Sequence, residues 1–126
     1  MKPTFNKTEI DDNELFEMGI YYIKQKALQE NFQIIHYQEP PFVPQYIFEK
    51  NNENFFLYIK VKRSPYELND IFSNDEIQGY VWSCQKRNVK LLLAGIVFSN
   101  GTDSKKPIYK EDKIEIDFTG IINMFE

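Results

Sequence analysis

Few residues in this chain are of the types that carry out catalysis. His36 is the only histidine and Cys84 the only cysteine. As a general base, His36 would need an orienting partner, and Glu39 is close in sequence; we favour a partly buried strand position instead. Cys84 falls on the apolar stripe of a predicted helix, whereas a nucleophilic thiolate needs an electropositive, partly exposed setting. We therefore predict structural roles for both residues, and a lone cysteine provides neither an internal disulfide nor a thiolate zinc site.

The sequence also lacks the usual motifs for cofactors and metals. It contains no glycine-rich loop before a helix, no Gly-x-Ser-x-Gly elbow and no second histidine to share a metal. The acidic run over residues 9–14 lacks the glycine that a calcium loop uses for its sharp turn. Carboxylates are in any case favoured at a helix N-terminus. We therefore predict neither a cofactor nor a metal site.

Two lysines of the segment 55–63 form a candidate binding surface. Lys60 and Lys62 alternate with apolar residues, so on a strand they project side by side about 7 Å apart. Phe56 and Tyr58 precede them on the same face. This pattern predicts a face that attracts anions and is bordered by aromatic rings. The other interpretation, which we favour, is an edge strand that its lysines protect against pairing with other chains.

Two amphipathic helices are expected to position these residues. The first spans residues 13–30 and begins with Asp11 and Glu14 at capping-box spacing. The second begins with Ser73 and Glu76 at the same spacing and ends at Asn88. Both carry apolar residues at helical intervals, in the second helix Ile77, Tyr80, Val81 and Cys84.

Five segments have the composition of strands: 32–38, 45–50, 55–63, 89–98 and 113–118. The run Glu39-Pro40-Pro41 ends the first, since proline cannot donate to a strand ladder. The fourth is continuously apolar, as is typical of a sheet centre covered on both faces. We predict an α/β or α+β fold with a mixed five-stranded sheet and two main helices, in the order α-β-β-β-α-β-β.

The bulk composition agrees with a single domain over residues 1–126. The chain is 42% hydrophobic and 16% aromatic, enough to form a core at this length. Its formal charge of −4 disfavours nucleic acid as the main partner, because affinity for phosphates comes from lysine and arginine. The first 14 residues lack the apolar region of a signal peptide, and no apolar run is long enough to cross a bilayer. We expect a cytoplasmic protein without a membrane partner.

One stretch resembles a known family. Pro44-Gln45-Tyr46-Ile47-Phe48, followed after a turn by Tyr58-Ile59-Lys60-Val61-Lys62, is similar to the signature of the PD-(D/E)xK nuclease superfamily, the restriction-endonuclease-like fold. The resemblance covers residues 12–100 and includes the flanking helices. It implies that Gln45 replaces the metal-binding aspartate and Lys60 the second acidic residue, and that only Lys62 is retained. Gln78 and Trp82 match the family's Gln-x-x-x-Tyr helix motif, with tryptophan in place of tyrosine.

Loss of the acidic ligands implies an inactive member of that superfamily. Our main hypothesis is a non-catalytic binding or interaction domain with a protein partner. Its candidate contact residues are Tyr46, Phe56, Tyr58, Lys60, Lys62 and Trp82. One alternative is a metal-dependent nuclease with migrated acidic ligands, using Glu17 and Glu49 together with Lys62. Another is a small-ligand module that encloses an apolar pocket between sheet and helix.

Overall fold

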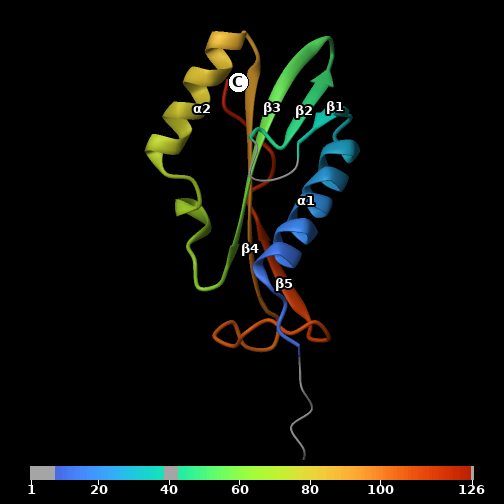
Figure 1. Ribbon diagram of the computed structural model, residues 1–126, viewed down its shortest axis with the longest axis vertical. Coiled ribbons are helices and arrows are strands. Elements are labelled where there is room, and N and C mark those ends of the chain that lie inside the picture. The colour runs from blue at the N-terminus through green and yellow to red at the C-terminus, as the bar shows by residue number, and fades with distance from the viewer. Residues whose placement is uncertain (1–7, 39–42, 126) are drawn as a thin grey trace, which may run out of the picture.

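Two helices cover opposite faces of one mixed six-stranded sheet (Figure 1). The computed structural model describes residues 8–38 and 43–125. The elements are α1 (Asp12–Gln29), β1 (Gln33–Tyr37), β2 (Tyr46–Lys50), β3 (Glu53–Arg63), the 3₁₀ turn η1 (Leu68–Asp70), α2 (Asn74–Arg87), β4 (Lys90–Asn100), β5 (Ile114–Phe118) and β6 (Ile122–Asn123). The predicted mixed α/β fold and its order are confirmed. The sheet has six strands instead of five, because the two-residue strand β6 also pairs with β4.

Strand β3 lies in the interior of the sheet. The strand order is β1-β2-β3-β4-β5, with β6 pairing β4 beyond the end of β5. β3 pairs with β2 in the antiparallel sense and with β4 in the parallel sense. The parallel pair requires a crossover, which α2 provides. The interpretation that we favoured from the sequence, an edge strand protected by its lysines, is therefore wrong.

Helix α1 packs over one face of the sheet. Its N-cap Asp11 accepts a hydrogen bond from the Glu14 amide at 2.8 Å, so the helix begins where the capping residues predict. Its apolar stripe meets the odd-numbered residues of β3, as the alternation predicts. The buried residues of this first core include Leu15, Ile20, Ile23, Ala27, Phe55, Leu57 and Ile59.

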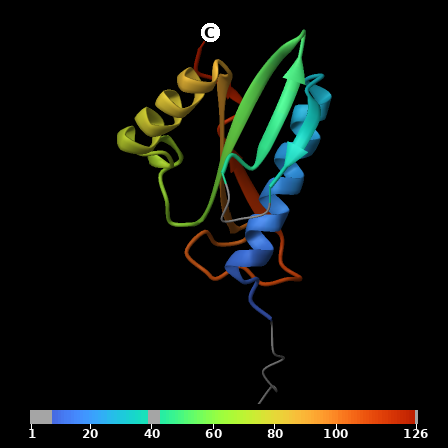
Figure 2. The same cartoon turned by 45° about the horizontal axis from the view of Figure 1, so that its top comes forward.

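Helix α2 covers the other face of the sheet, in Figure 2 on the side away from α1. Both hydrogen bonds of the predicted capping box between Ser73 and Glu76 are present, and Asn88 ends the helix in the left-handed conformation. The predicted apolar stripe forms a second core with Tyr58, Leu91 and Leu93. The tyrosine rings of Tyr58 and Tyr80 stack with their centroids 3.8 Å apart.

The edge strand β1 departs from the predicted burial pattern. The pairing of β1 with β2 shifts register between Ile34 and His36, and His36 is exposed rather than partly buried. An extra residue in one strand re-aims the side chains that follow it, which explains the difference. Glu39, the proposed partner of His36, lies outside the described residues, as does the predicted stop at Pro40-Pro41.

None of the helices in the described part of the chain combines the length and apolar character needed to cross a membrane.

Two helical glycines should respond oppositely to the same substitution. A Cβ on Gly19 would collide with Val61 Cγ2, whereas a Cβ on Gly79 would meet no atom within 4 Å. We expect Gly19→Ala to lower the free energy of unfolding by about 1–3 kcal/mol through overpacking. Gly79→Ala should raise it by about 0.5–1 kcal/mol through helix propensity. Urea denaturation at low protein concentration measures both; a stabilising Gly19→Ala would contradict the packing of α1 on β3.

Candidate functional site

An ion pair between β3 and α2 lies at one of the motif positions. Lys60 Nζ and Glu76 Oε1 are 2.8 Å apart, and their side chains are 24% and 33% exposed. Lys60 projects from the face of β3 that α2 covers, close to the point where this cover ends. Glu76 is the third residue of α2 and also accepts a hydrogen bond from the Ser73 amide at 2.9 Å. The capping box therefore holds the carboxylate in place for the lysine.

Glu76 is stabilised in its charged form. The hydrogen bond from Lys60 is the largest influence, and with the bond from the Ser73 amide it lowers the pKa of Glu76 below its usual 4.5. The Lys60 ammonium also lies 6.0 Å from the centroid of the Phe72 ring. The charge of Lys60 is thus balanced within the chain, which weakens it as a site for an external anion.

Gln45 serves the backbone of the sheet. Its side chain is buried, with 5% exposure, and its Oε1 accepts a hydrogen bond from the Ile59 amide at 2.8 Å. Its backbone N–H donates to the Leu57 carbonyl at 3.1 Å. Gln45 therefore extends the pairing with β3 by one residue before the start of β2. An amide oxygen that is already bonded and carries no charge is a poor replacement for a metal-binding carboxylate.

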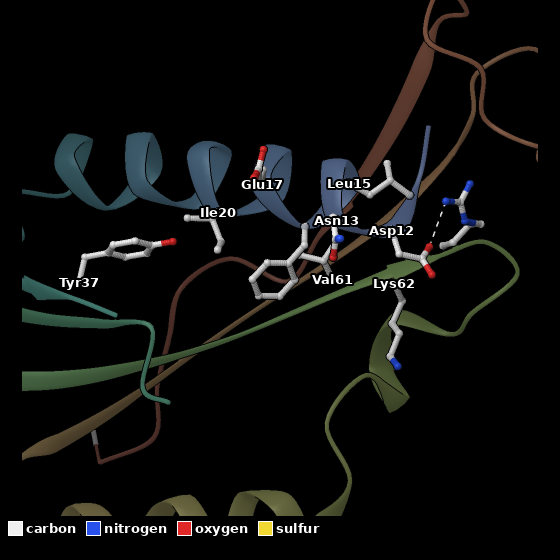
Figure 3. Close-up of a pocket in the computed structure, with 10 residues that line it drawn as sticks. Asp12, Asn13, Leu15, Glu17, Ile20, Tyr37, Val61 and Lys62 are labelled. Carbon is white, nitrogen blue, oxygen red and sulfur yellow. Dashed lines mark hydrogen bonds and ion pairs between the residues drawn. The ribbon is translucent and has the colours of Figure 1, made fainter. Parts of the chain in front are cut away.

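Lys62 lies two residues beyond Lys60 on β3. It lines a groove between α1 and β3 with a volume of about 790 Å³. Its ammonium lies 5.5 Å from the centroid of the Tyr66 ring. Gln45 binds the backbone of Ile59, the residue before Lys60, but neither Gln45 nor Lys60 lines this groove. The groove residues are Asp12, Asn13, Leu15, Phe16, Glu17, Ile20, Tyr37, Val61, Lys62 and Arg63 (Figure 3).

Arg63 fastens the start of α1 to the end of β3. Its Nη2 donates to the Ile10 carbonyl at 2.6 Å and to Asp12 at 3.0 Å. A weaker contact of 3.5 Å joins Nη1 to Glu9. Sequence patterns do not predict this interaction, because no spacing rule connects residues more than 50 positions apart. Likewise, the capping-box spacing predicts only a capping role for Glu76, and no pattern in the sequence indicates a role for Tyr37.

Two of the predicted contact residues belong to the core. Tyr46 and Tyr58 are 5% and 3% exposed, so the expectation that they form surface aromatics is wrong. Burial, reinforced by nearby Tyr37, raises the pKa of Tyr46 to about 12. Phe56 is half-buried against the second core. Trp82 is 64% exposed.

The outer side of α2 carries the remaining motif residues. Gln78 is exposed, on the side of the helix away from the sheet, as is Trp82. Gln78 and Trp82 therefore point away from the sheet, where Gln45 and Lys60 lie. The resemblance to the Gln-x-x-x-Tyr motif is not matched by a shared site.

The acidic residues considered as migrated ligands do not converge. Glu49 pairs with Asn54, and Lys62 lies eight residues beyond Asn54 on β3, roughly 26 Å away at about 3.3 Å per residue. Glu17 points away from β3 while Lys62 points away from α1 (Figure 3). Within residues 8–38 and 43–125, no three histidine, cysteine, aspartate or glutamate side chains are grouped to hold a metal ion.

The chain matches a family described as Domain of unknown function (DUF8840), over residues 13–124. The match includes both helices and all six strands, apart from the first residue of α1. No curated protein matches the chain. Nor does any solved structure.

Replacing Glu76 by glutamine should isolate the ion pair. Glutamine can keep the capping-box hydrogen bond, so Glu76→Gln should lose only the contribution of Lys60, up to about 1 kcal/mol for a partly exposed pair. Because folding lowers the pKa of Glu76, its contribution is complete above the unfolded value of 4.5 and is lost as the pH falls through the lower folded value.

Urea denaturation of wild type and Glu76→Gln, at neutral pH and in steps below pH 4.5, measures this effect. The difference between the two proteins should shrink as the pH falls. A difference that stays constant with pH would show that the substitution acts through something other than the charge of Glu76.

Cys84 should be inert in the folded protein. Its side chain has no exposure, and burial raises the pKa of its thiol to about 11, so very little thiolate exists at neutral pH. We expect iodoacetamide to label Cys84 only after unfolding in urea. Mass spectrometry of native and unfolded samples checks this. Rapid labelling of the native protein would contradict the packing of α2 on β4.

Proposed function

We propose that this chain, which belongs to the family described as Domain of unknown function (DUF8840), is a non-catalytic interaction domain on the framework of a PD-(D/E)xK nuclease. The ion pair between Lys60 and Glu76, at 2.8 Å, carries this proposal. At the motif position where the superfamily has an acidic metal ligand, this chain has an ammonium group that is held by its own carboxylate.

The arrangement of the elements supports the nuclease-like framework. A helix precedes the hairpin of β2 and β3, a second helix follows it, and the apolar strand β4 comes next, parallel to β3. These are the flanking elements that the resemblance implies. Gln45 also binds the backbone of Ile59, the residue that precedes Lys60 on β3.

The chemistry of these residues supports the absence of catalysis. Metal-dependent hydrolysis of a phosphodiester needs anionic oxygen ligands that hold the ion and lower the pKa of its water. Lys60 would repel such an ion, and the Gln45 carboxamide is bonded to the Ile59 amide. The residues at the motif positions therefore do not fit a divalent metal, and we derive no catalytic step through one.

The geometry gives less support to the two alternatives. Glu17, Glu49 and Lys62 are separated and differently oriented, which disfavours a nuclease with migrated ligands. A small-ligand module would need an apolar pocket enclosed between the sheet and a helix; packed cores fill the interior on both faces, and the groove between α1 and β3 has four charged side chains in its lining.

A protein segment is the partner that suits the groove between α1 and β3. Its lining combines the aromatic rings of Phe16 and Tyr37 with two carboxylates and two cations, those of Asp12, Glu17, Lys62 and Arg63. A lining of mixed charge lacks the excess of lysine and arginine that a nucleic-acid backbone needs, whereas aromatic residues are enriched in protein interfaces. Tyr37 is 40% exposed and packs against Tyr46 in a tilted arrangement, with the ring centroids 5.0 Å apart, so its ring is already held in place.

We expect the wild-type chain to cleave neither DNA nor RNA in millimolar Mg²⁺ or Mn²⁺, and its melting temperature to be unchanged by these ions. Ligand binding to the folded state alone would raise that temperature. Lys62→Ala is the critical variant, and Lys105→Ala, an exposed loop lysine, is its control. Cleavage that is lost in Lys62→Ala and kept in Lys105→Ala would contradict the proposal.

The groove is tested by affinity capture with identification of the bound protein. Tyr37→Ala should reduce recovery of that protein, while Tyr21→Ala should not, because Tyr21 is an exposed aromatic of α1 outside the groove.

A further inference from the structure

The outer side of α2 carries an exposed stripe that no part of the described chain covers. The stripe consists of Asp75, Gly79, Trp82 and Lys86, all exposed. Their spacing places them on one side of a helix, opposite to the core stripe of α2. In Figures 1 and 2 this side of the helix faces away from the sheet, and no other element packs against it. We call these four residues the α2 stripe.

The α2 stripe contains two residues that the fold itself does not require. Gly79 lies in the middle of the helix, where glycine is the least favourable residue after proline. A Cβ there would meet no atom within 4 Å, in contrast to Gly19, whose neighbour Val61 leaves no room. Trp82 exposes 64% of its surface, with the Lys86 ammonium 4.8 Å from its ring centroid. Each is explained if another backbone approaches Gly79 and covers the indole.

We propose that the α2 stripe is a self-association surface, on which two copies of the chain pack α2 against α2 in antiparallel orientation about a two-fold axis. This surface is separate from the groove of the proposed function. The register that places Trp82 of each copy on Gly79 of the other also places Asp75 opposite Lys86. One geometry thus covers both indoles and forms two pairs of opposite charge, as a two-fold interface requires of a self-complementary surface.

Charge distinguishes this arrangement from other modes of self-association. A parallel pair of helices would place Asp75 opposite Asp75 and Lys86 opposite Lys86, and like charges across an interface are unfavourable. The edge strand β5 is also poorly suited. Antiparallel pairing of two copies about Ile116 would place Glu115 opposite Asp117, which is again repulsive.

The expected dimer is weak and depends on concentration. A helix of 14 residues is about 21 Å long, so the contact is at the small end of specific interfaces. Tryptophan residues that are covered in an interface often dominate its affinity. Truncation of Trp82 should therefore weaken the dimer by about 30-fold or more, the factor that corresponds to a hot-spot residue.

Sedimentation velocity over a range of concentrations of the full chain tests the proposal. Wild type should shift from monomer towards dimer, whereas Trp82→Ala and Gly79→Gln should remain monomeric. Gly79→Gln fills the space for the indole with a good helix former, so its melting temperature at low concentration should rise while association is lost. Tyr21→Ala is the matched control, since Tyr21 is 65% exposed, and it should associate like wild type.

A pair of charge variants tests the register. Alone, Asp75→Lys places two lysines opposite each other and Lys86→Glu places two carboxylates opposite each other, so each variant should be monomeric. Mixed together, they should form a heterodimer with both ion pairs restored. Wild type that is monomeric at every concentration, a dimer that persists in Trp82→Ala, or a mixture that fails to associate would overturn the proposal.

Discussion

The structure depends on one constraint, that β3 must supply residues to two separate cores. Its odd positions pack beneath α1, and Phe56 and Tyr58 pack beneath α2. Where the cover of α2 ends, the same face continues with Lys60 and Lys62. A shift of one residue in the pairing of β3 would move the lysines into the first core and its aliphatic residues out of it. The register of β3 is therefore fixed from both sides at once.

The ion pair of Lys60 and Glu76 joins this constraint to the proposed function. The Lys60 side chain projects from β3 at the boundary between the second core and solvent. The first turn of α2 places the carboxylate of Glu76 at that boundary. The same capping box that begins the helix orients the carboxylate. At the position where the resemblance to the nuclease superfamily implies an acidic ligand, this chain has a lysine that makes a structural contact with Glu76.

Local signals predicted most of the fold, because capping residues and apolar periodicity act over short distances. Ser73, Glu76 and Asn88 mark both ends of α2, and the alternation in β3 correctly divides its residues between two faces. Alternation shows which face a side chain takes, but not whether another element covers that face. For that reason Tyr58 was predicted at the surface although α2 buries it.

The remaining errors come from long-range arrangement. The position of β3 inside the sheet follows from its pairing with β4, which no local pattern reveals. The contacts of Arg63 with the start of α1 depend on the whole path of the chain between them. At the candidate site, the sequence identified Gln45 and Lys60 as departures from a motif, and only the structure connects them to the partners Ile59 and Glu76.

The exposure of Trp82 has a consequence for spectroscopy. It is the only tryptophan of the chain, and it lies on the outer side of α2 instead of in either core. In the monomer its indole is in contact with water whether the sheet is folded or not. The intrinsic tryptophan emission of this protein therefore reports on the surface of one helix, and the melting of the cores is followed by circular dichroism or by the buried tyrosines.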